Sequence, residues 1–251
     1  MRNIKLTIEY DGTLYSGWQT QNHPRLKGHS KFRKTIQSTI EGVLTRILQE
    51  HISLTASGRT DAGVHAREQT AHFKTRTKLS CSRIQFSLNS LLPCDIIVSS
   101  VKDVSPDFHA RYSAVSKWYR YTILTRTYSS VFLRNFVWLY PYPVDIKKIK
   151  KEARFLVGTH DFKSFQTRGS HDGNTVRTVY KVEIIRDKDL MYIDIRANGF
   201  LYNMVRSIVG TLMDINRGKL KDMKSIVRAK DRKKAGITAP PQGLCLMKVY
   251  Y

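Results

Sequence analysis

The sequence predicts an α+β protein made of two related halves. From Ile4 to Tyr10, apolar and polar residues alternate with the period of two that marks a half-buried strand. From Thr35 to Glu50, apolar residues recur at helical spacing and form one stripe. After Pro106 a similar order of strands and helices begins again. We therefore expect halves at residues 1–110 and 111–251, in a mixed or antiparallel sheet flanked by helices.

The other elements of the first half follow from the same patterns. Asp11 and Gly12 form a turn that ends the first strand. A second amphipathic helix stops before Pro93, because proline cannot continue a helix. Beyond the first strand and helix, the expected elements are a strand at Gln69–Lys74, a helix at Ser80–Leu91 and a strand at Ile96–Val104.

The second half is predicted from its caps and turns. Asp145 is placed to cap a helix that extends to Val157. The sequence Asp187-Lys188-Asp189 is placed to turn a hairpin. The expected strands are Lys117–Leu124, Val176–Ile185, Leu190–Ile195 and Leu244–Tyr250, with a helix at Tyr202–Ile215. Because the last strand is mostly apolar, we expect a central position for it.

The charge of the chain is the first indication of function. The 251 residues include 43 Lys and Arg but only 20 Asp and Glu, a formal net charge of +23. Such an excess favours a polyanionic partner, either a nucleic acid or an anionic membrane surface. The residues are 41% hydrophobic and the cations are spread along the chain, which excludes a disordered basic tail.

The composition also indicates the cellular compartment. No apolar run is long enough to span a bilayer, and the first residues read as a strand without a signal-peptide core. Cys81, Cys94 and Cys245 are an odd number without a close pair, which supports neither a disulfide framework nor a zinc knuckle. We therefore expect a protein of the reducing cytoplasm.

The densest cluster of special residues is the segment Ser57–Ala66, which lies between a helix and a strand. Two glycines, an arginine, an aspartate and a histidine within it suit a backbone that bends tightly while presenting side chains to a ligand. The same residues also suit an ordinary turn at Asp61-Ala62-Gly63. Composition alone favours that second interpretation.

A resemblance carried by eight sequence blocks favours the ligand-presenting loop over the ordinary turn. These blocks occur in family order over nearly the whole chain and resemble the tRNA pseudouridine synthase A (TruA) family. The blocks are Tyr15–Gln19, Gly58–Ala66, Gln69–Phe73, Phe108–Ala114, Lys117–Tyr121, His160–Phe165, Gly199–Arg206 and Ala239–Leu244. The resemblance implies the pseudouridine synthase fold, with two ferredoxin-like halves and the active-site cleft between them.

The resemblance also implies an activity and partners. It indicates an enzyme without cofactor or metal that isomerises uridine to pseudouridine on the 3′ side of the tRNA anticodon stem-loop. It further implies a homodimer whose basic cleft spans both subunits. No small-molecule cofactor and no membrane are expected as partners.

Asp61 matches the single catalytic aspartate of the family. One carboxylate is chemically sufficient, because the uracil need only be detached from the ribose carbon, turned, and rejoined through a carbon of its ring. The carboxylate can attack covalently as a nucleophile, or it can stabilise a cationic sugar and remove a proton as a base. Both roles stay open.

Three further residues match the family's active site, and each has a plainer alternative. Arg206 matches the arginine beside the aspartate, but it could also be an exposed helix residue. Arg59 matches an arginine thought to enter the space left by a flipped base, but it could instead contact a phosphate. Tyr119 matches the tyrosine against the extruded base, but it could also be a packed core residue.

Trp18 and His65 are weaker candidates for substrate binding. Trp18 could line the same neighbourhood or anchor the first loop. His65, together with His72 and His109, lacks partners at a metal-ligand spacing, so a structural or RNA-contacting role is expected for these histidines.

Three other function classes compete with a tRNA-modifying isomerase. The first is a non-catalytic RNA-binding protein of the same fold, in which a carboxylate such as Asp61 would only repel phosphates. The second is a pseudouridine synthase with altered uridine or RNA specificity. The third is a metal-dependent nuclease, a class that gathers several carboxylates where this motif supplies one.

Two basic segments add to these expectations. The segment His23–Lys34 is longer than the short link usual in the family. It could extend the RNA-binding surface, alter which uridines are reached, or form a solvated loop. For most of the lysines in Arg217–Lys234 we expect a solvated helical face, with RNA binding as the alternative.

Overall fold

The structure is a computed structural model that describes residues 1–19, 34–167 and 173–251. The basic segment predicted at His23–Lys34 lies outside these residues except for Lys34. Two compact units divide the chain: unit 1 contains residues 1–114, 246–249 and 251, and unit 2 contains residues 115–245 and 250. The predicted division of roles, with a catalytic first half and a second half that completes the cleft, stays a prediction.

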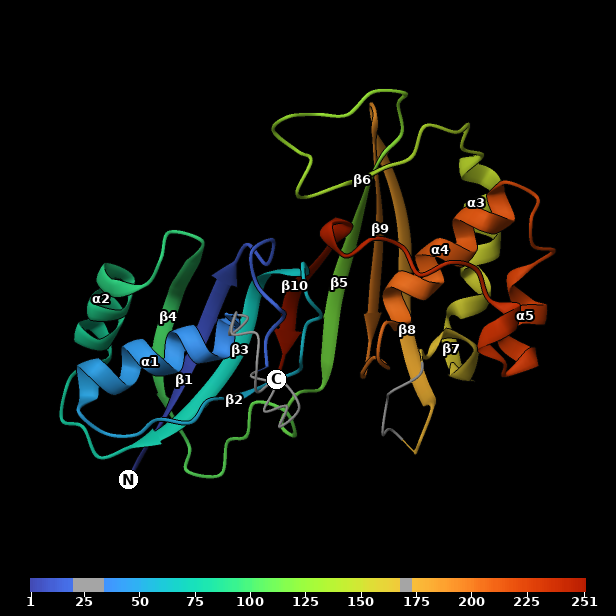
Figure 1. The fold of residues 1–251 in the computed structure, drawn as a ribbon. Coiled ribbons are helices and arrows are strands. Elements are labelled where there is room, and N and C mark those ends of the chain that lie inside the picture. Colours follow the sequence, from blue (N-terminus) through green and yellow to red (C-terminus); the bar gives the residue numbers. More distant parts are fainter. Residues whose placement is uncertain (20–33, 168–172) are drawn as a thin grey trace, which may run out of the picture. The chain divides into compact units, whose positions relative to one another are not determined.

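Unit 1 has the ferredoxin-like order of elements (Figure 1). In chain order it contains β1 (Arg2–Tyr10), α1 (Ile36–Leu48), β2 (Thr55–Ala56), β3 (His65–Thr75), α2 (Cys81–Leu91) and β4 (Ile96–Val104). The sheet order is β4-β1-β3-β2, and every neighbouring pair is antiparallel. Residues 246–249 of β10 (Leu244–Tyr250) also belong to this unit. The ferredoxin-like half predicted from the sequence is therefore confirmed here.

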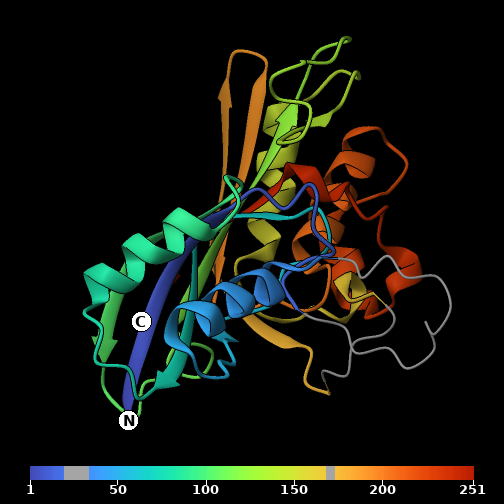
Figure 2. The same cartoon turned by 60° about the vertical axis from the view of Figure 1, so that its left-hand side comes forward.

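The core of unit 1 lies between this sheet and its two helices. The alternating apolar residues of β1, Ile4, Leu6, Ile8 and Tyr10, are all buried, as predicted. Helix α1 buries Ile36, Ile40 and Leu44, and α2 buries Ile84 and Leu88. In Figures 1 and 2 the two helices cover the same face of the sheet. The predicted amphipathic helices thus supply the second layer of the unit.

Unit 2 contains the other strands and helices (Figure 1). They are β5 (Ser116–Leu124), β6 (Trp138–Leu139), α3 (Ile146–Ala153), β7 (Gly158–Asp161), β8 (Val176–Asp187), β9 (Leu190–Ala197), α4 (Met204–Asn216) and α5 (Met223–Ala229). The strands follow the order β5-β9-β8-β7 in antiparallel pairs, and β6 runs parallel to β5. Strands β5, β9 and β8 thus repeat the order of β1, β3 and β2 in unit 1.

Helix α4 is the central helix of unit 2. Eleven of its thirteen residues are buried, among them Val205, Ile208 and Leu212 on the predicted packed side. Helices α3, α4 and α5 contact one another (Figure 1). Because α4 is enclosed by neighbours, a polar side chain on it needs a partner within the protein.

Two predicted elements differ from the structure by four residues at one end, whereas the other long elements differ by one or two residues at most. Strand β3 begins at His65 rather than Gln69, because a register shift opposite Ile8 and Tyr10 interrupts the period of two near Arg67 and Glu68. The helix predicted to reach Val157 is α-helical only to Ala153 and continues as a 3₁₀ turn. Its predicted cap is correct, since the Asp145 side chain accepts a hydrogen bond from Lys148 N at 3.0 Å.

The lysines of Arg217–Lys234 are all exposed, as expected, but other residues of this segment pack within unit 2. Helix α5 lies within it and buries Met223, Ile226 and Val227. The Arg232 guanidinium donates to the carbonyl of Gly236 at 2.8 Å and to the Thr238 hydroxyl at 2.9 Å. Part of the segment is therefore a packed element of unit 2.

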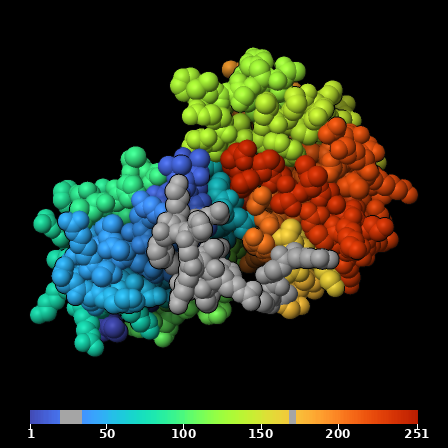
Figure 3. All heavy atoms as spheres, in the orientation of Figure 1, coloured from blue at the N-terminus to red at the C-terminus, as the bar shows by residue number. Residues whose placement is uncertain are grey.

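The segment between β5 and α3 exposes apolar side chains. It forms the lime-green surface of unit 2 in Figure 3. Tyr128, Val131 and Phe132 are 65, 74 and 91% exposed.

Among the described residues, no helix is long and apolar enough to cross a membrane.

Candidate active site

The loop of unit 1 that carries Asp61 is attached to strand β3 at its start. Ser57 Oγ donates to Gln69 Oε1 at 2.7 Å, and Gln69 Nε2 donates to the Gly58 carbonyl at 3.0 Å. Ser57 N also donates to the Thr70 carbonyl at 2.8 Å. Ser57 and Gln69 are fully buried, so these bonds are shielded from water. The first residues of the loop are therefore held in one conformation.

The residues next to Asp61 are fixed as well. The hydroxyls of Tyr10 and Thr60 lie 2.7 Å apart, and Trp18 N donates to the Thr60 carbonyl at 3.0 Å. Val64 N donates to the Asp61 carbonyl at 3.1 Å, which closes the turn. Asp61 is half-buried and Arg59 is exposed. The loop thus presents a carboxylate at a defined place, with a guanidinium nearby in the chain.

Glycine at position 17 allows the first loop to approach the backbone of Asp61. Its φ is +88°, and a Cβ there would lie 2.6 Å from the Thr60 carbonyl oxygen and 3.0 Å from the Asp61 carbonyl carbon. Such contacts involve backbone, which cannot move aside without shifting the loop. The Tyr15–Gln19 block is therefore part of the support of the Asp61 loop.

We expect Gly17→Ala to destabilise unit 1 by about 2 kcal/mol or more, because it adds a clash to a left-handed backbone. Chemical denaturation measures the change in the free energy of unfolding. The matched control is Gly42→Ala in helix α1, where a Cβ meets nothing within 4 Å. That change should stabilise the protein by about 0.5–1 kcal/mol. Equal stabilities of the two variants would contradict the close approach.

Trp18 and His65 are buried and contact residues at the end of β1 and in the loop that follows it. Trp18 is 2% exposed and its ring lies 6.0 Å from that of Tyr10. His65 is 4% exposed, and its Nδ1 lies 3.1 Å from both Gly12 N and Asp11 Oδ1. These contacts agree with the anchoring alternative for Trp18 and with a structural role for His65. Their contact with substrate stays a prediction.

In unit 2, Tyr119 lies on strand β5 and is 8% exposed. Its ring meets that of Phe200 edge-on, with 5.0 Å between the centroids. Tyr121 and Ile123 follow on the same side of the strand and are fully buried. Tyr119 is thus the outermost aromatic residue of a packed row, and Phe200 is a neighbour that the sequence reasoning did not single out.

Arg206 is half-buried on α4 and is not the solvent-facing arginine of the alternative interpretation. Its Nε donates to the Ala239 carbonyl at 2.8 Å, and its Nη1 donates to Asn203 Oδ1 at 2.7 Å. The Ala239 N–H in turn donates to the Arg206 carbonyl at 3.1 Å. The side chain of Arg206 is therefore held between its own helix and the Ala239–Leu244 block.

The Ala239–Leu244 block is fastened to β5 by Tyr121. The Tyr121 hydroxyl donates to the Pro240 carbonyl at 2.7 Å, and a Cβ at Gly243 would lie 2.6 Å from the Tyr121 ring. Burial raises the pKa of Tyr121, so the hydroxyl keeps its proton at neutral pH. Tyr121 is a supporting residue to which the sequence analysis gave no role of its own.

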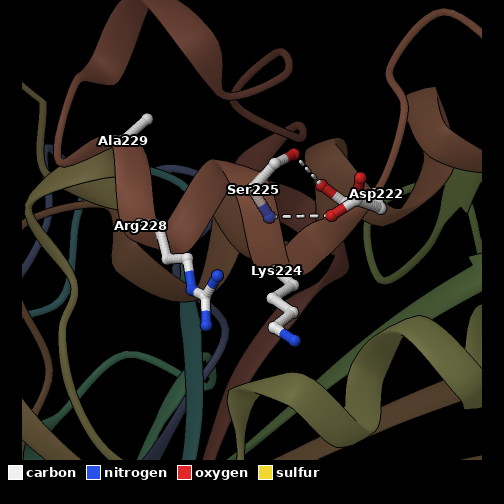
Figure 4. Close-up of a pocket in the computed structure, with 5 residues that line it drawn as sticks. All are labelled: Asp222, Lys224, Ser225, Arg228 and Ala229. Atoms are coloured by element: carbon white, nitrogen blue, oxygen red, sulfur yellow. Dashed lines mark hydrogen bonds between the residues drawn. The ribbon is translucent and has the colours of Figure 1, made fainter.

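In the part of the chain that the structure describes, the predicted site residues belong neither to a metal cluster nor to the pocket at α5. In residues 1–19, 34–167 and 173–251, no group of three or more His, Cys, Asp or Glu could hold a metal ion. A pocket at α5 is lined by Asp222, Lys224, Ser225, Arg228 and Ala229 (Figure 4). There Asp222 only caps the helix, accepting from Ser225 N at 2.7 Å. None of the predicted site residues lines this pocket.

Comparison with known proteins decides the family. The family described as tRNA pseudouridine synthase matches the chain at residues 6–113 and 153–251. The chain belongs to this family. The match includes four residues predicted in unit 1 and Arg206 in unit 2, whereas Tyr119 lies between the matched ranges. The four residues of unit 1 are Trp18, Arg59, Asp61 and His65.

Relatives of the tRNA pseudouridine synthase family extend over the whole chain. A protein of Thermoanaerobacter sp. (strain X514) named tRNA pseudouridine synthase A is 47% identical, with 100% of both chains covered. One of the same name from Caldicellulosiruptor bescii is 44% identical with the same coverage. A Clostridium perfringens protein named tRNA pseudouridine synthase A 2 is 43% identical, again over 100% of both chains.

One solved structure has a weak similarity to this chain. The crystal structure of the archaeal box H/ACA sRNP Nop10-Cbf5 complex gives a TM-score of 0.38 at 12% identity. The alignment covers 84% of this chain and 42% of that chain. The family assignment does not depend on this likeness, and the predicted membership is confirmed by the sequence matches alone.

Proposed function

We propose that this chain isomerises uridine to pseudouridine in tRNA and that Asp61 supplies the catalytic carboxylate. The observation that carries the proposal is the loop around Asp61, which is bound on both sides while Asp61 itself is only half-buried. A carboxylate held in this way costs no reorganisation when charge develops on a bound sugar. The full-length relatives named tRNA pseudouridine synthase A support the same activity.

The proposed reaction is balanced without a co-reactant. The bond between uracil N1 and the ribose carbon breaks, and a bond between uracil C5 and the same ribose carbon forms. The proton that leaves C5 is matched by one gained at N1, so no atom or electron is added. Asp61 acts either by covalent attack on the sugar or by stabilising a cationic sugar and accepting the proton. Either role requires the ionised carboxylate.

The other predicted residues have supporting roles in this proposal. Arg206 supplies a positive charge, and its hydrogen bonds to Ala239 and Asn203 restrict the orientation of the guanidinium. Tyr119 contacts the extruded base through an aromatic ring that Phe200 holds edge-on. Arg59, which is exposed, contacts RNA either in the space left by the base or at a phosphate.

We expect Arg206→Lys to lower kcat for pseudouridine formation by about 10- to 100-fold, because lysine keeps the charge but not the planar fork that Ala239 and Asn203 hold. Steady-state kinetics with unmodified tRNA measure the change. The control is Arg228→Lys, an exposed position on α5, with an expected change below about twofold. A rise in KM at constant kcat would instead make Arg206 a binding residue.

The finer parts of the function follow from the resemblance. We propose that the uridines lie on the 3′ side of the anticodon stem-loop, that the active protein is a homodimer, and that it works in the cytoplasm. The net charge of +23 supports a long contact with the tRNA backbone. Some cations are used internally, such as Arg120, which binds Asp194 through two bonds of 2.7 and 2.8 Å.

The test of the proposed function uses the pure protein, dialysed against EDTA, and a set of unmodified tRNAs. We expect pseudouridine to form in the anticodon stem-loop with and without the chelator. Loss of the product after EDTA treatment would favour a metal-dependent activity. Tight tRNA binding without product from any tRNA would favour the non-catalytic RNA-binding protein, and product outside the stem-loop would indicate altered specificity.

A further inference from the structure

Tyr112 is an exposed aromatic residue in the Phe108–Ala114 block of unit 1, to which the proposed reaction gives no task. The block lies in the green connection that follows β4 (Figure 1). Tyr112 is 78% exposed, although its ring already rests on a neighbour. A ring that is exposed and already held in one orientation is prepared to stack on a flat ligand.

The ring of Tyr112 is held in place by His109. The two rings are stacked, with 4.3 Å between centroids and 26° between planes. His109 Nδ1 accepts hydrogen bonds at 3.2 Å from both Arg111 N and Tyr112 N. Ser113 closes the turn, since its Oγ accepts from His109 N at 3.1 Å and its N–H donates to the His109 carbonyl at 2.9 Å.

His109 in turn rests on buried residues of the sheet. Its ring lies 4.9 Å from that of His72, which is 7% exposed. His72 Nδ1 accepts from Ala110 N at 3.2 Å. Burial and the neighbouring His109 lower the pKa of His72, which agrees with a neutral ring that accepts this bond. The stack from His72 through His109 to Tyr112 is therefore attached to the buried part of unit 1.

The surroundings of this stack are cationic. The Arg111 guanidinium lies 5.8 Å from the centre of the Tyr112 ring. Lys5 Nζ lies 5.5 Å from the ring centres of both Phe108 and Tyr251. From residue 108 to residue 144 the sequence contains no Asp or Glu, and Asp107 is the nearest acidic residue before this stretch. A ligand that combines a flat ring with negative charge is complementary to such a surface.

We propose that Tyr112, His109 and Arg111 form a stacking platform that binds an unpaired nucleobase of the tRNA substrate. Tyr112 offers the ring for stacking and Arg111 pairs with an adjacent phosphate. The proposal rests on the proposed function for the identity of the RNA. It adds a binding site that is separate from the catalytic loop.

The platform and the catalytic loop bind different nucleotides. The hydroxyl of Thr60, next to Asp61, is hydrogen-bonded to Tyr10, and Tyr10 pairs with Ala66 of β3. The platform is attached to the same strand at His72. Ala66 and His72 are six positions apart on this strand, so the platform and the Asp61 loop are made by different residues. We therefore assign the stacked base to a nucleotide other than the uridine that reacts.

Three variants test the platform. Tyr112→Ala removes the ring, Tyr112→Phe keeps it, and Tyr180→Ala removes a tyrosine that is 49% exposed on β8 as the matched control. We expect Tyr112→Ala to weaken binding of unmodified tRNA by about 5- to 100-fold and to raise KM with kcat unchanged. Tyr112→Phe and Tyr180→Ala should stay within about twofold of wild type. Thermal unfolding checks that each variant is folded.

Other outcomes would overturn the proposal. Unchanged tRNA affinity in folded Tyr112→Ala would exclude stacking, and an equal loss in Tyr180→Ala would show a general surface effect. A change in the oligomeric state of Tyr112→Ala, measured by gel filtration with light scattering, would assign the ring to contact between copies of the chain. Because affinity is measured without turnover, failure of the platform is distinguishable from failure of the proposed function, which appears as absence of pseudouridine with wild type.

Discussion

Replacing Asp61 by asparagine is expected to lower the rate of pseudouridine formation by about 10³-fold or more, with tRNA affinity within about twofold of wild type. Asparagine has nearly the same shape, and the loop that holds Asp61 is fixed through Thr60, Val64 and the backbone of Asp61 itself. The variant therefore removes the charge and the nucleophile without removing the support. Single-turnover assays with excess protein separate this chemical step from binding.

The matched control for Asp61→Asn is Asp11→Asn. Asp11 belongs to the same loop system, where its Oδ1 accepts from Thr13 N at 2.9 Å, a bond that asparagine can also accept. We expect this variant to form pseudouridine at a rate within about threefold of wild type. Comparable losses in both variants would mean that any change of charge near the loop is harmful, which would remove the special role of Asp61.

The second large effect is the dependence of tRNA binding on salt. A protein that contacts about 6–10 phosphates loses about 10³- to 10⁵-fold in affinity between roughly 50 and 200 mM salt, because cations condensed on the RNA are released on binding. The net charge of +23 leads us to expect a loss in this range. Filter binding with Asp61→Asn over a salt series measures the slope without turnover.

The salt series is interpretable only if the protein stays folded at every salt concentration used. Circular dichroism over the same concentrations should be constant, since the cores of both units are apolar. An affinity that changes less than about threefold over this range would contradict binding through the phosphate backbone. The tRNA would then be held mainly by uncharged contacts.

The long elements were predictable because each has a regular pattern that its own residues carry. The strand at Ile4–Tyr10 and the helix at Thr35–Glu50 correspond to β1 and α1, and the predicted cap at Asp145 is observed. Strands β2, β6 and β7 have two to four residues, too few for a period to show. The buried side of helix α5 was not predicted, because its apolar residues are surrounded by lysines and arginines.

The site was predictable in its special residues but not in their support. Gly58–Ala66 stands out by composition, and the family blocks single out Asp61 and Arg206. The bonds from Tyr10 to Thr60 and from Arg206 to Ala239 join residues 50 and 33 positions apart. Such pairs depend on how strands and helices pack, which no local pattern in one sequence specifies. The same limit concealed the role of Tyr121 beneath the Ala239–Leu244 block.

The most direct test of the central claim is to map pseudouridine in one unmodified tRNA after incubation with wild-type protein and, in parallel, with Asp61→Asn. Both proteins are used at concentrations that bind the tRNA to the same extent. We predict pseudouridine in the anticodon stem-loop with wild type and none above background with the variant. No pseudouridine with wild type, or equal amounts with both proteins, would contradict the account.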